Sequence, residues 1–222
     1  MARTARSTAR PTLVLLVRHG RTPTTGTTLP GRARGLHLSP EGVAQAEAVA
    51  ARIASMGRAA VGGKVSAVIA SPLERTRETA RPIGAALGLR VGIDRGLLEC
   101  DFGDWTGRKL VDLARKPEWT TVQRWPSGFR FPGGESFLEM QTRMVDAVDR
   151  LAAAHRGRTI VAVSHADPIK ALVAHALGTH LDQFQRIVIS PCSVTAILLT
   201  AAGPTVLTVN STGDDLSRLA VS

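Results

Sequence analysis

Residues 13–20 read LVLLVRHG, where five apolar residues lead directly into an arginine, a histidine and a glycine. A run that is apolar at every position is typical of a central strand of a parallel sheet, which is buried on both faces. A buried strand usually excludes arginine, because a charge loses its hydration in the core. Arg18 and His19 at the tip of such a strand therefore indicate a role other than packing.

Several other stretches resemble this strand. Residues 65–70 (VSAVIA) and 159–164 (TIVAVS) are short, apolar on both faces and rich in β-branched residues. Further strands are expected at 89–93, 186–190, 193–200 and 204–210. The residues just after each strand deserve inspection, because ligands of open α/β sheets bind outside the carboxyl ends of the strands.

Helices are expected between the strands. Ser39 and Pro40 form an N-cap and a first helical turn, and Val43, Ala46, Ala50, Ile53 and Ala54 then share one face. Further helices are expected at 71–87, 135–155 and 167–178, and residues 100–134 predict an irregular excursion with one short helix. The alternation of strands and helices predicts an α/β domain with helices on both faces of the sheet.

Composition narrows the partners and the compartment. The 222 residues carry a net charge of +10, which favours acidic partners such as phosphorylated metabolites, nucleic acid or anionic lipid, although an arginine-rich codon bias explains it equally well. Scattered basic residues and an aromatic content of 4% argue against a base-stacking nucleic-acid surface. No apolar run is long enough for a membrane span.

The two cysteines, Cys100 and Cys192, form neither a disulfide framework nor a zinc-site spacing, which favours the cytoplasm. Residues 1–11 predict a disordered basic tail without an apolar signal region, residues 12–212 a single domain, and residues 213–222 a C-terminal tail.

Charged residues follow four of the expected strands. Arg18 and His19 follow the first strand, Arg75 the second, His165 the strand at 159–164, and Glu99 or Asp101 the strand at 89–93. A single histidine or arginine at a strand end is usually structural, but such residues at the ends of four strands on one edge of the sheet are hard to explain by packing. Two guanidinium groups suit a phosphate, and they keep a neighbouring histidine neutral and nucleophilic.

A carboxylic acid in the same place could protonate a departing oxygen. Gly20 could bring backbone N–H groups close to an anion. The competing interpretation, a metal centre of His19, His165 and a carboxylate, is disfavoured because two arginines would repel a dication.

These residues lie in motifs that resemble the histidine phosphatase superfamily, which includes phosphoglycerate mutases and acid phosphatases. Five motifs appear in the expected order over residues 12–200. They are RHG (18–20), GRARGLHLSPEGVAQA (31–46), SPLERTRETA (71–80), ECDFGDWTG (99–107) and VSHADPIKALVAHALG (163–178). The resemblance implies a three-layer α/β/α sandwich with a mixed, mostly parallel central sheet.

The resemblance also implies roles for the matching residues. His19 would be the nucleophile that becomes phosphohistidine, and Arg18, Arg75 and His165 would hold the phosphoryl oxygens. Glu99 would be the general acid, with Asp101 as a rival, and no metal or other cofactor is implied.

Two departures from the family pattern change the expected substrate contacts. Thr25 stands where many members have an asparagine that contacts phosphate, and the segment with Arg32 and Arg34 stands where many members have an aspartate. Arg21, Arg32 and Arg34 near the mouth suggest a second acidic group on the substrate, although flexible surface arginines explain them equally well. Thr25, Arg32 and Arg21 are therefore expected to bind substrate together with Arg18, Arg75 and His165.

The sequence favours a phosphomonoester hydrolase that acts on a small phosphorylated metabolite through phosphohistidine. The alternative is a phosphomutase of the same chemistry. A non-catalytic phospho-ligand binder is a third option, but pure binding needs neither His19 nor Glu99. Neither nucleic acid nor a membrane is an expected partner, and the oligomeric state stays open, with a dimer as one option.

Overall fold

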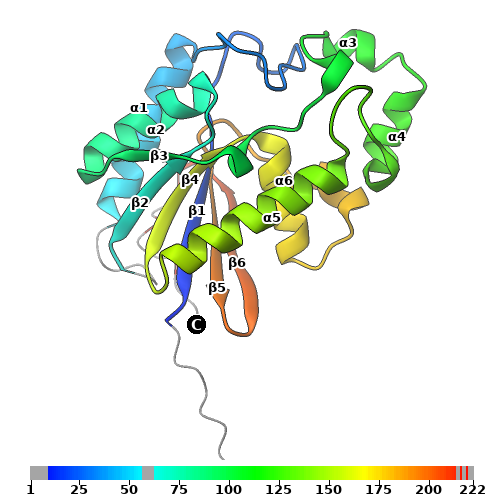
Figure 1. The fold of residues 1–222 in the computed structure, drawn as a ribbon. Helices are drawn as coiled ribbons and strands as arrows, with labels where there is room; N and C mark the ends of the chain where they lie inside the picture. The colour runs from blue at the N-terminus through cyan, green and yellow to red at the C-terminus, as the bar shows by residue number, and fades with distance from the viewer. Residues whose placement is uncertain (1–9, 57–62, 214–215, 217–218, 220–222) are drawn as a thin grey trace, which may run out of the picture.

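A six-stranded sheet forms the centre of the protein in the computed structural model, which describes residues 10–56, 63–213, 216 and 219. The strand order is β3 (Val91–Ile93), β2 (Val65–Ala70), β4 (Thr159–Ser164), β1 (Thr12–Arg18), β5 (Val194–Thr200) and β6 (Gly203–Ser211). The first four run parallel, whereas β5 pairs antiparallel with β1 and β6. The sheet is therefore mixed and mostly parallel, as expected (Figure 1).

Four helices cover the two faces of the sheet. Leu13, Leu15 and Val17 of β1 share a core with α1 (Pro40–Ser55) and α2 (Glu74–Leu87). Val14 and Leu16 share the opposite core with α5 (Phe137–Ala154) and α6 (Ala166–Ala176). Because side chains alternate along a strand, β1 supplies both cores and is buried on both sides. The result is the three-layer α/β/α sandwich (Figure 1).

An aromatic cluster supports the long excursion between β3 and α5. The excursion contains η1 (Arg95–Leu97), η2 (Gly103–Trp105), α3 (Leu110–Leu113), α4 (Glu118–Arg124) and η3 (Pro126–Gly128). It therefore has two short α-helices where the sequence predicted one. Trp105 packs against Phe129 and Phe131, with ring centroids 5.5 Å and 5.4 Å away. Figure 1 shows α3 and α4 beyond the upper end of the sheet, where the parallel strands end.

The expected strand at 186–190 is wrong. Residues Leu181–Arg186 form a 3-10 helix, η4, and residues 187–190 have no regular structure. Their backbone groups bond to side chains instead: Arg18 donates to the Ile189 carbonyl at 2.6 Å, and Ser190 N–H donates to Asn210 at 2.6 Å.

The core face of α1 is narrower than its sequence indicates. Ala46, Ala50 and Ile53 are buried as expected, but Val43 is 47% exposed and Ala54 is also exposed.

Most of the two expected tails lies outside the described residues. Gly213, Leu216 and Leu219 of the C-terminal stretch are described, and the two leucines pack against the core that β1 shares with α1 and α2. Among the described residues, no helix combines the length and the apolarity that a membrane span requires.

Two glycines allow α1 to begin directly beside the end of β1. A Cβ on Gly20 would lie 2.5 Å from the Gly42 carbonyl oxygen, and a Cβ on Gly42 would lie 2.0 Å from the Arg21 carbonyl oxygen. Both distances are far below van der Waals contact, and the obstructing atoms are backbone. The close approach fixes the chain that follows His19 against the first turn of α1.

We expect Gly42→Ala to destabilise the protein although alanine is the better helix former. The added methyl group must displace backbone, which costs about 1–3 kcal/mol, whereas helix propensity alone would stabilise by about 1 kcal/mol. The free energy of unfolding in urea measures the effect, with Val43→Ala, at the exposed neighbouring position, as the control. A Gly42→Ala protein more stable than the wild type would contradict the close approach.

Candidate active site

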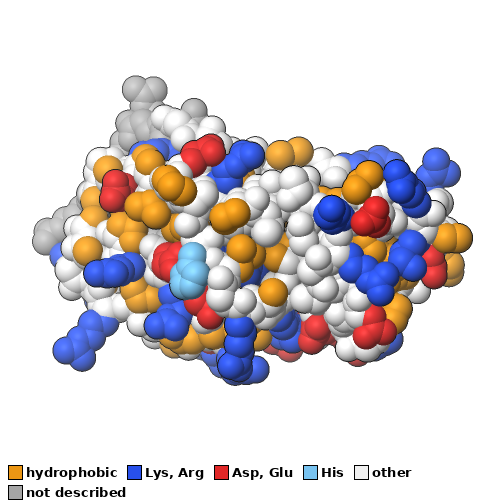
Figure 2. Space-filling model, turned by 90° about the horizontal axis from the view of Figure 1, so that it is seen from above, with side chains coloured by type: hydrophobic (Ala, Val, Ile, Leu, Met, Phe, Trp, Pro, Cys, Tyr) orange, Lys and Arg blue, Asp and Glu red, His pale blue; other side chains and the backbone are white. Residues whose placement is uncertain are grey.

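The expected site residues meet at the carboxyl ends of the parallel strands. Arg18 ends β1, His19 follows it, Arg75 lies in the first turn of α2 after β2, and His165 is the N-cap of α6 after β4. Figure 2 views this end of the molecule from above, where basic side chains lie in separate groups with acidic ones beside them rather than in one stripe.

A pocket of about 420 Å³ opens beside these residues. Arg18, His19 and Glu99 line it, and the β1–α1 loop adds Thr22, Thr24, Thr25, Gly26, Thr28, Leu29 and Pro30. Another side is formed by Ala166, Asp167 and Lys170 of α6 with Gln185 and residues 187–189. The excursion between β3 and α5 contributes Phe102, Leu110 and Trp119, whereas Arg75 and His165 are absent from the described lining.

His19 has a defined tautomer and no positive charge. It is 5% exposed, and its Nδ1 lies 2.8 Å from the Gly20 carbonyl oxygen, which can only accept a hydrogen bond. Nδ1 therefore carries the proton, and Nε2 presents a lone pair 3.3 Å from the Arg75 Nε donor. Burial, and then the charges of Arg75 and Arg18, hold the pKa of His19 well below its usual value. A neutral imidazole whose Nε2 carries a lone pair can act as a nucleophile at neutral pH.

Three buried nitrogen atoms around His19 have no hydrogen-bond partner among the described residues. They are Arg18 Nε, Arg75 Nη1 and His165 Nδ1. Other atoms of the same side chains are held by the protein: Arg18 Nη1 donates to the Ile189 carbonyl, Arg75 Nη2 donates to the Gly31 carbonyl at 2.7 Å, and His165 Nε2 lies 2.8 Å from Ser71 Oγ. Unpaired buried donors are costly, and an anion would satisfy them. We call Arg18, His19, Arg75 and His165 the anion cup.

Glu99 is held in a nearly dry position beside the cup. It is 7% exposed, and Oε1 accepts a hydrogen bond of 2.9 Å from the Cys100 N–H. Burial first, and then the negative charge of Asp167, raise the pKa of Glu99 to about 7, against the opposing effects of Cys100 N–H, Arg75 and Arg18. The carboxyl can therefore both give and take a proton near neutral pH.

Asp101 has a different environment. Its side chain is 40% exposed, accepts a hydrogen bond from Gly103 N–H and pairs with Arg32. Glu99 lines the pocket and Asp101 is absent from the described lining, so the structure favours Glu99 as the acid.

The residues expected at the mouth divide into two groups. Thr25 lines the pocket, and its Oγ accepts a hydrogen bond from Thr22 N–H at 2.9 Å. Arg21 pairs with Glu41 and is half exposed, and Arg32 donates to the Glu99 carbonyl and pairs with Asp101 and Glu135. Neither arginine belongs to the described pocket lining.

The anion contact expected at Gly20 is not what the structure shows. Its N–H donates to Thr79 Oγ at 3.0 Å, and its missing side chain makes room for Gly42 rather than for a ligand.

Sequence reasoning did not single out Lys170 and Gln185 as pocket residues. Lys170 Nζ lies 3.2 Å from Asp167 Oδ1 and 3.2 Å from Gln185 Oε1. The spacing of Asp167 and Lys170 in the first turns after His165 could have indicated that both face the site. Gln185 carries no such signal, because η4 is distant in sequence.

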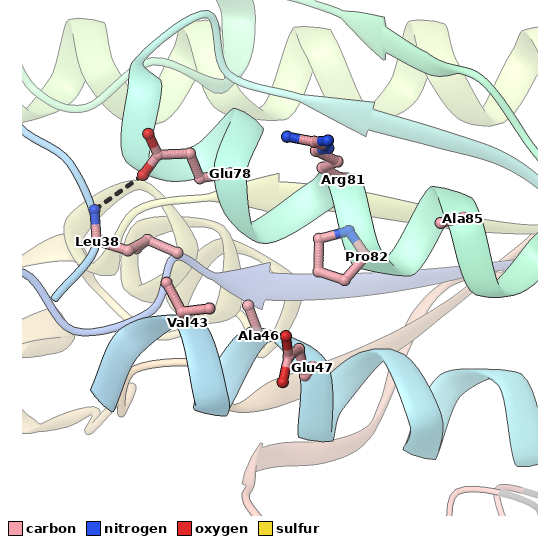
Figure 3. A pocket seen from close by; sticks show the side chains of 8 residues that line it. All are labelled: Leu38, Val43, Ala46, Glu47, Glu78, Arg81, Pro82 and Ala85. Carbon is pink, nitrogen blue, oxygen red and sulfur yellow. Dashed lines mark hydrogen bonds between the residues drawn. The ribbon is translucent and has the colours of Figure 1, made fainter. Parts of the chain in front are cut away.

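A second hollow, of about 330 Å³, lies between α1 and α2 (Figure 3). Val43, Ala46, Pro82 and Ala85 face it, with Glu47, Glu78 and Arg81 at its rim. Glu78 accepts a hydrogen bond from Leu38 N–H at 2.8 Å. The described lining of this hollow holds no histidine, cysteine or serine, so it offers no candidate nucleophile of these types.

Curated relatives include phosphatases and mutases. The bifunctional protein Rv2228c of Mycobacterium tuberculosis is 34% identical over 207 residues, covering 91% of this chain and 55% of that protein. The chain thus spans about half the length of that relative. Phosphoserine phosphatase 1 of Hydrogenobacter thermophilus is 31% identical over 161 residues, 69% of this chain and 72% of that one. The probable phosphoglycerate mutase GpmB of Erwinia tasmaniensis is 33% identical over 193 residues, 83% of each chain.

Solved structures share the fold. The mycobacterial glucosyl-3-phosphoglycerate phosphatase Rv2419c superposes with a TM-score of 0.79 at 24% identity, covering 91% of this chain and all of that one. The family model described as "Histidine phosphatase superfamily (branch 1)" matches residues 14–212. This match, together with the identity to GpmB, shows that the chain belongs to the histidine phosphatase superfamily.

Proposed function

We propose that the protein is a metal-independent phosphomonoester hydrolase that acts on a small phosphorylated metabolite through a phosphohistidine at His19. One observation carries the proposal: the Nε2 lone pair of a neutral histidine lies among buried arginine donors and a buried histidine nitrogen that lack partners in the described part of the chain. A phosphoryl group would satisfy these donors and lie within reach of the lone pair.

In the first step, His19 Nε2 attacks phosphorus and the bond from phosphorus to the ester oxygen breaks. Glu99, protonated in part near pH 7, gives its proton to that oxygen, so the alcohol leaves neutral. Arg18, Arg75 and His165 stabilise the charge on the three equatorial oxygens. The Gly20 carbonyl holds the Nδ1 proton and stabilises the imidazolium character of the phosphohistidine.

In the second step, the Glu99 carboxylate takes a proton from water while the water oxygen attacks phosphorus. The bond between phosphorus and Nε2 breaks, which returns a neutral His19 and a protonated Glu99 and releases inorganic phosphate. One carboxyl thus serves as acid and then as base, which fits a pKa of about 7.

A phosphomutase is the second candidate. It would return the phosphoryl group to the bound intermediate instead of to water, and the likeness to GpmB favours it. The likeness to phosphoserine phosphatase 1 favours the hydrolase. A screen of phosphorylated metabolites separates them, because a hydrolase releases one inorganic phosphate per ester consumed and a mutase yields an isomeric ester.

We expect His19→Ala to lower phosphate release from 4-nitrophenyl phosphate by at least about 10³-fold, because no other nucleophile replaces Nε2. The assay is run with and without EDTA, and the wild-type rate should be the same in both, since guanidinium groups supply the charge. His175→Ala, an exposed histidine on α6, is the control and should retain full activity. Full activity of His19→Ala would refute the nucleophile, and loss of wild-type activity in EDTA would refute metal independence.

We expect Glu99→Gln to act according to the leaving group. On phenyl phosphate, whose phenoxide is a poor leaving group, the loss of kcat/KM should reach about 10²-fold or more, the usual contribution of a general acid. On 4-nitrophenyl phosphate, which has the same shape but a better leaving group, the loss should be much smaller.

The pH profile gives an independent measure of the same group. The first step needs the protonated acid, so wild-type kcat/KM on phenyl phosphate should fall as the pH rises through about 7. This alkaline decline should disappear in Glu99→Gln. Equal losses on both esters, or an unchanged decline, would exclude Glu99 as the acid.

A further inference from the structure

Three charged side chains meet behind the general acid. Arg32 comes from the β1–α1 loop, Glu135 from the segment before α5, and Arg143 from α5 itself. Their side chains are 27%, 19% and 21% exposed, so all three are largely withdrawn from water. We call them the clamp. Like Arg75 and His165, none of them belongs to the described pocket lining, but Arg32 and Arg143 contact the main chain of Glu99 and, among the described residues, not the anion cup. We therefore expect their effect on the reaction to pass through Glu99.

All five N–H groups of Arg143 are used. Nη1 donates to the carbonyls of Gly96 and Leu98 at 2.7 Å and 2.9 Å, and Nη2 donates to the Glu99 carbonyl at 3.3 Å. The remaining two donors, on Nε and Nη2, bind the two carboxylate oxygens of Glu135 at 2.9 Å and 3.0 Å. Lysine has three donors and no planar fork, so it could not reproduce this set.

Arg32 approaches the same backbone from another direction. Its Nε donates to the Glu99 carbonyl at 2.9 Å, and Nη2 pairs with Glu135 at 2.7 Å. The Glu99 carbonyl therefore accepts hydrogen bonds from two guanidinium groups. Gly31, the residue before Arg32, is also held in place, because its carbonyl accepts a hydrogen bond from Arg75 of the anion cup.

Glu135 makes this arrangement possible. Two guanidinium groups on one carbonyl repel each other unless a carboxylate lies between them. Glu135 accepts two hydrogen bonds from Arg143 and forms an ion pair with Arg32, whose Nη2 makes no hydrogen bond within the described structure. Burial opposes its ionisation, but the bonds and charge of Arg143, the Asp101 N–H and Arg32 together lower the pKa of Glu135 below its usual value. It is therefore ionised over the whole neutral range.

We propose that Arg32, Glu135 and Arg143 are positioning residues for the general acid, which fix the main chain of Glu99 relative to the phosphoryl group held by the anion cup. The proposal rests on the proposed function, in which Glu99 protonates the leaving oxygen. The Glu99 carboxyl itself has one described hydrogen bond, from Cys100 N–H, so its location depends on the backbone that the clamp holds. Small displacements of a catalytic group are costly, since proton transfer needs hydrogen-bond contact.

The test compares Arg32→Gln and Glu135→Gln with the wild type on phenyl phosphate and 4-nitrophenyl phosphate. We expect kcat/KM to fall about 10-fold or more on phenyl phosphate but only about two-fold on 4-nitrophenyl phosphate. The reason is that the clamp positions Glu99 and does not position the residues of the anion cup. Arg150→Gln is the matched control: Arg150 lies two turns further along α5, pairs with Asp94, and should leave both rates unchanged.

A double variant separates positioning from general loss of structure. If the clamp acts through Glu99, adding Arg32→Gln to Glu99→Gln should cause no further loss on phenyl phosphate, because coupled residues are non-additive. Thermal unfolding identifies variants that do not fold. Arg32→Lys keeps the charge but loses the fork, and it should show the same leaving-group dependence in a folded protein.

The outcomes distinguish the two proposals. If Glu99→Gln affects both esters equally, Glu99 is not the acid and the proposed function fails together with the clamp. The clamp proposal alone is overturned by two results, provided that the loss of kcat/KM in Glu99→Gln depends on the leaving group. The first is an equal loss on both esters in Arg32→Gln, Arg32→Lys and Glu135→Gln. The second is an additive loss in the double variant.

Discussion

The structure depends on two guanidinium groups placed at the edge of the sheet without an ion pair. Arg75 is fully buried and Arg18 largely so, and within the described chain their hydrogen bonds go to backbone carbonyls and to His19 rather than to a carboxylate. Burying a charge without a counter-ion is unfavourable, and removing a partner from such a charge usually costs several kcal/mol. The proposed function accounts for these charges, because an incoming phosphoryl anion would pair with them.

The same charges determine the chemistry of their neighbours. Burial and these charges together keep the pKa of His19 well below its usual value, so the proposed nucleophile needs no separate base. The charges also oppose the effect of burial on Glu99, whose pKa stays near 7 rather than rising further. In the proposed function, the same two buried charges thus account for the anion site, for the neutral nucleophile and for a carboxyl that can exchange protons near neutral pH.

The sequence was sufficient to predict the three layers, the central strands and the residues of the cup. Central strands are apolar on both faces, and a buried strand that ends in Arg-His leaves few structural explanations. The residues 187–190 were mistaken for a strand, because an apolar β-branched run has the same pattern whether its backbone bonds to another strand or to Arg18 and Asn210. The contacts of Arg32 were also beyond prediction, since they depend on how three loops distant in sequence meet in space.

The direct test of the account is to locate the phosphoryl group in the trapped intermediate by ³¹P NMR and by mass spectrometry of peptides from alkaline-quenched enzyme. Because the Gly20 carbonyl occupies the Nδ1 proton, the account predicts a phosphoramidate on Nε2 of His19, stable in base and lost in acid. Phosphate on Nδ1, or on any other residue, would contradict it.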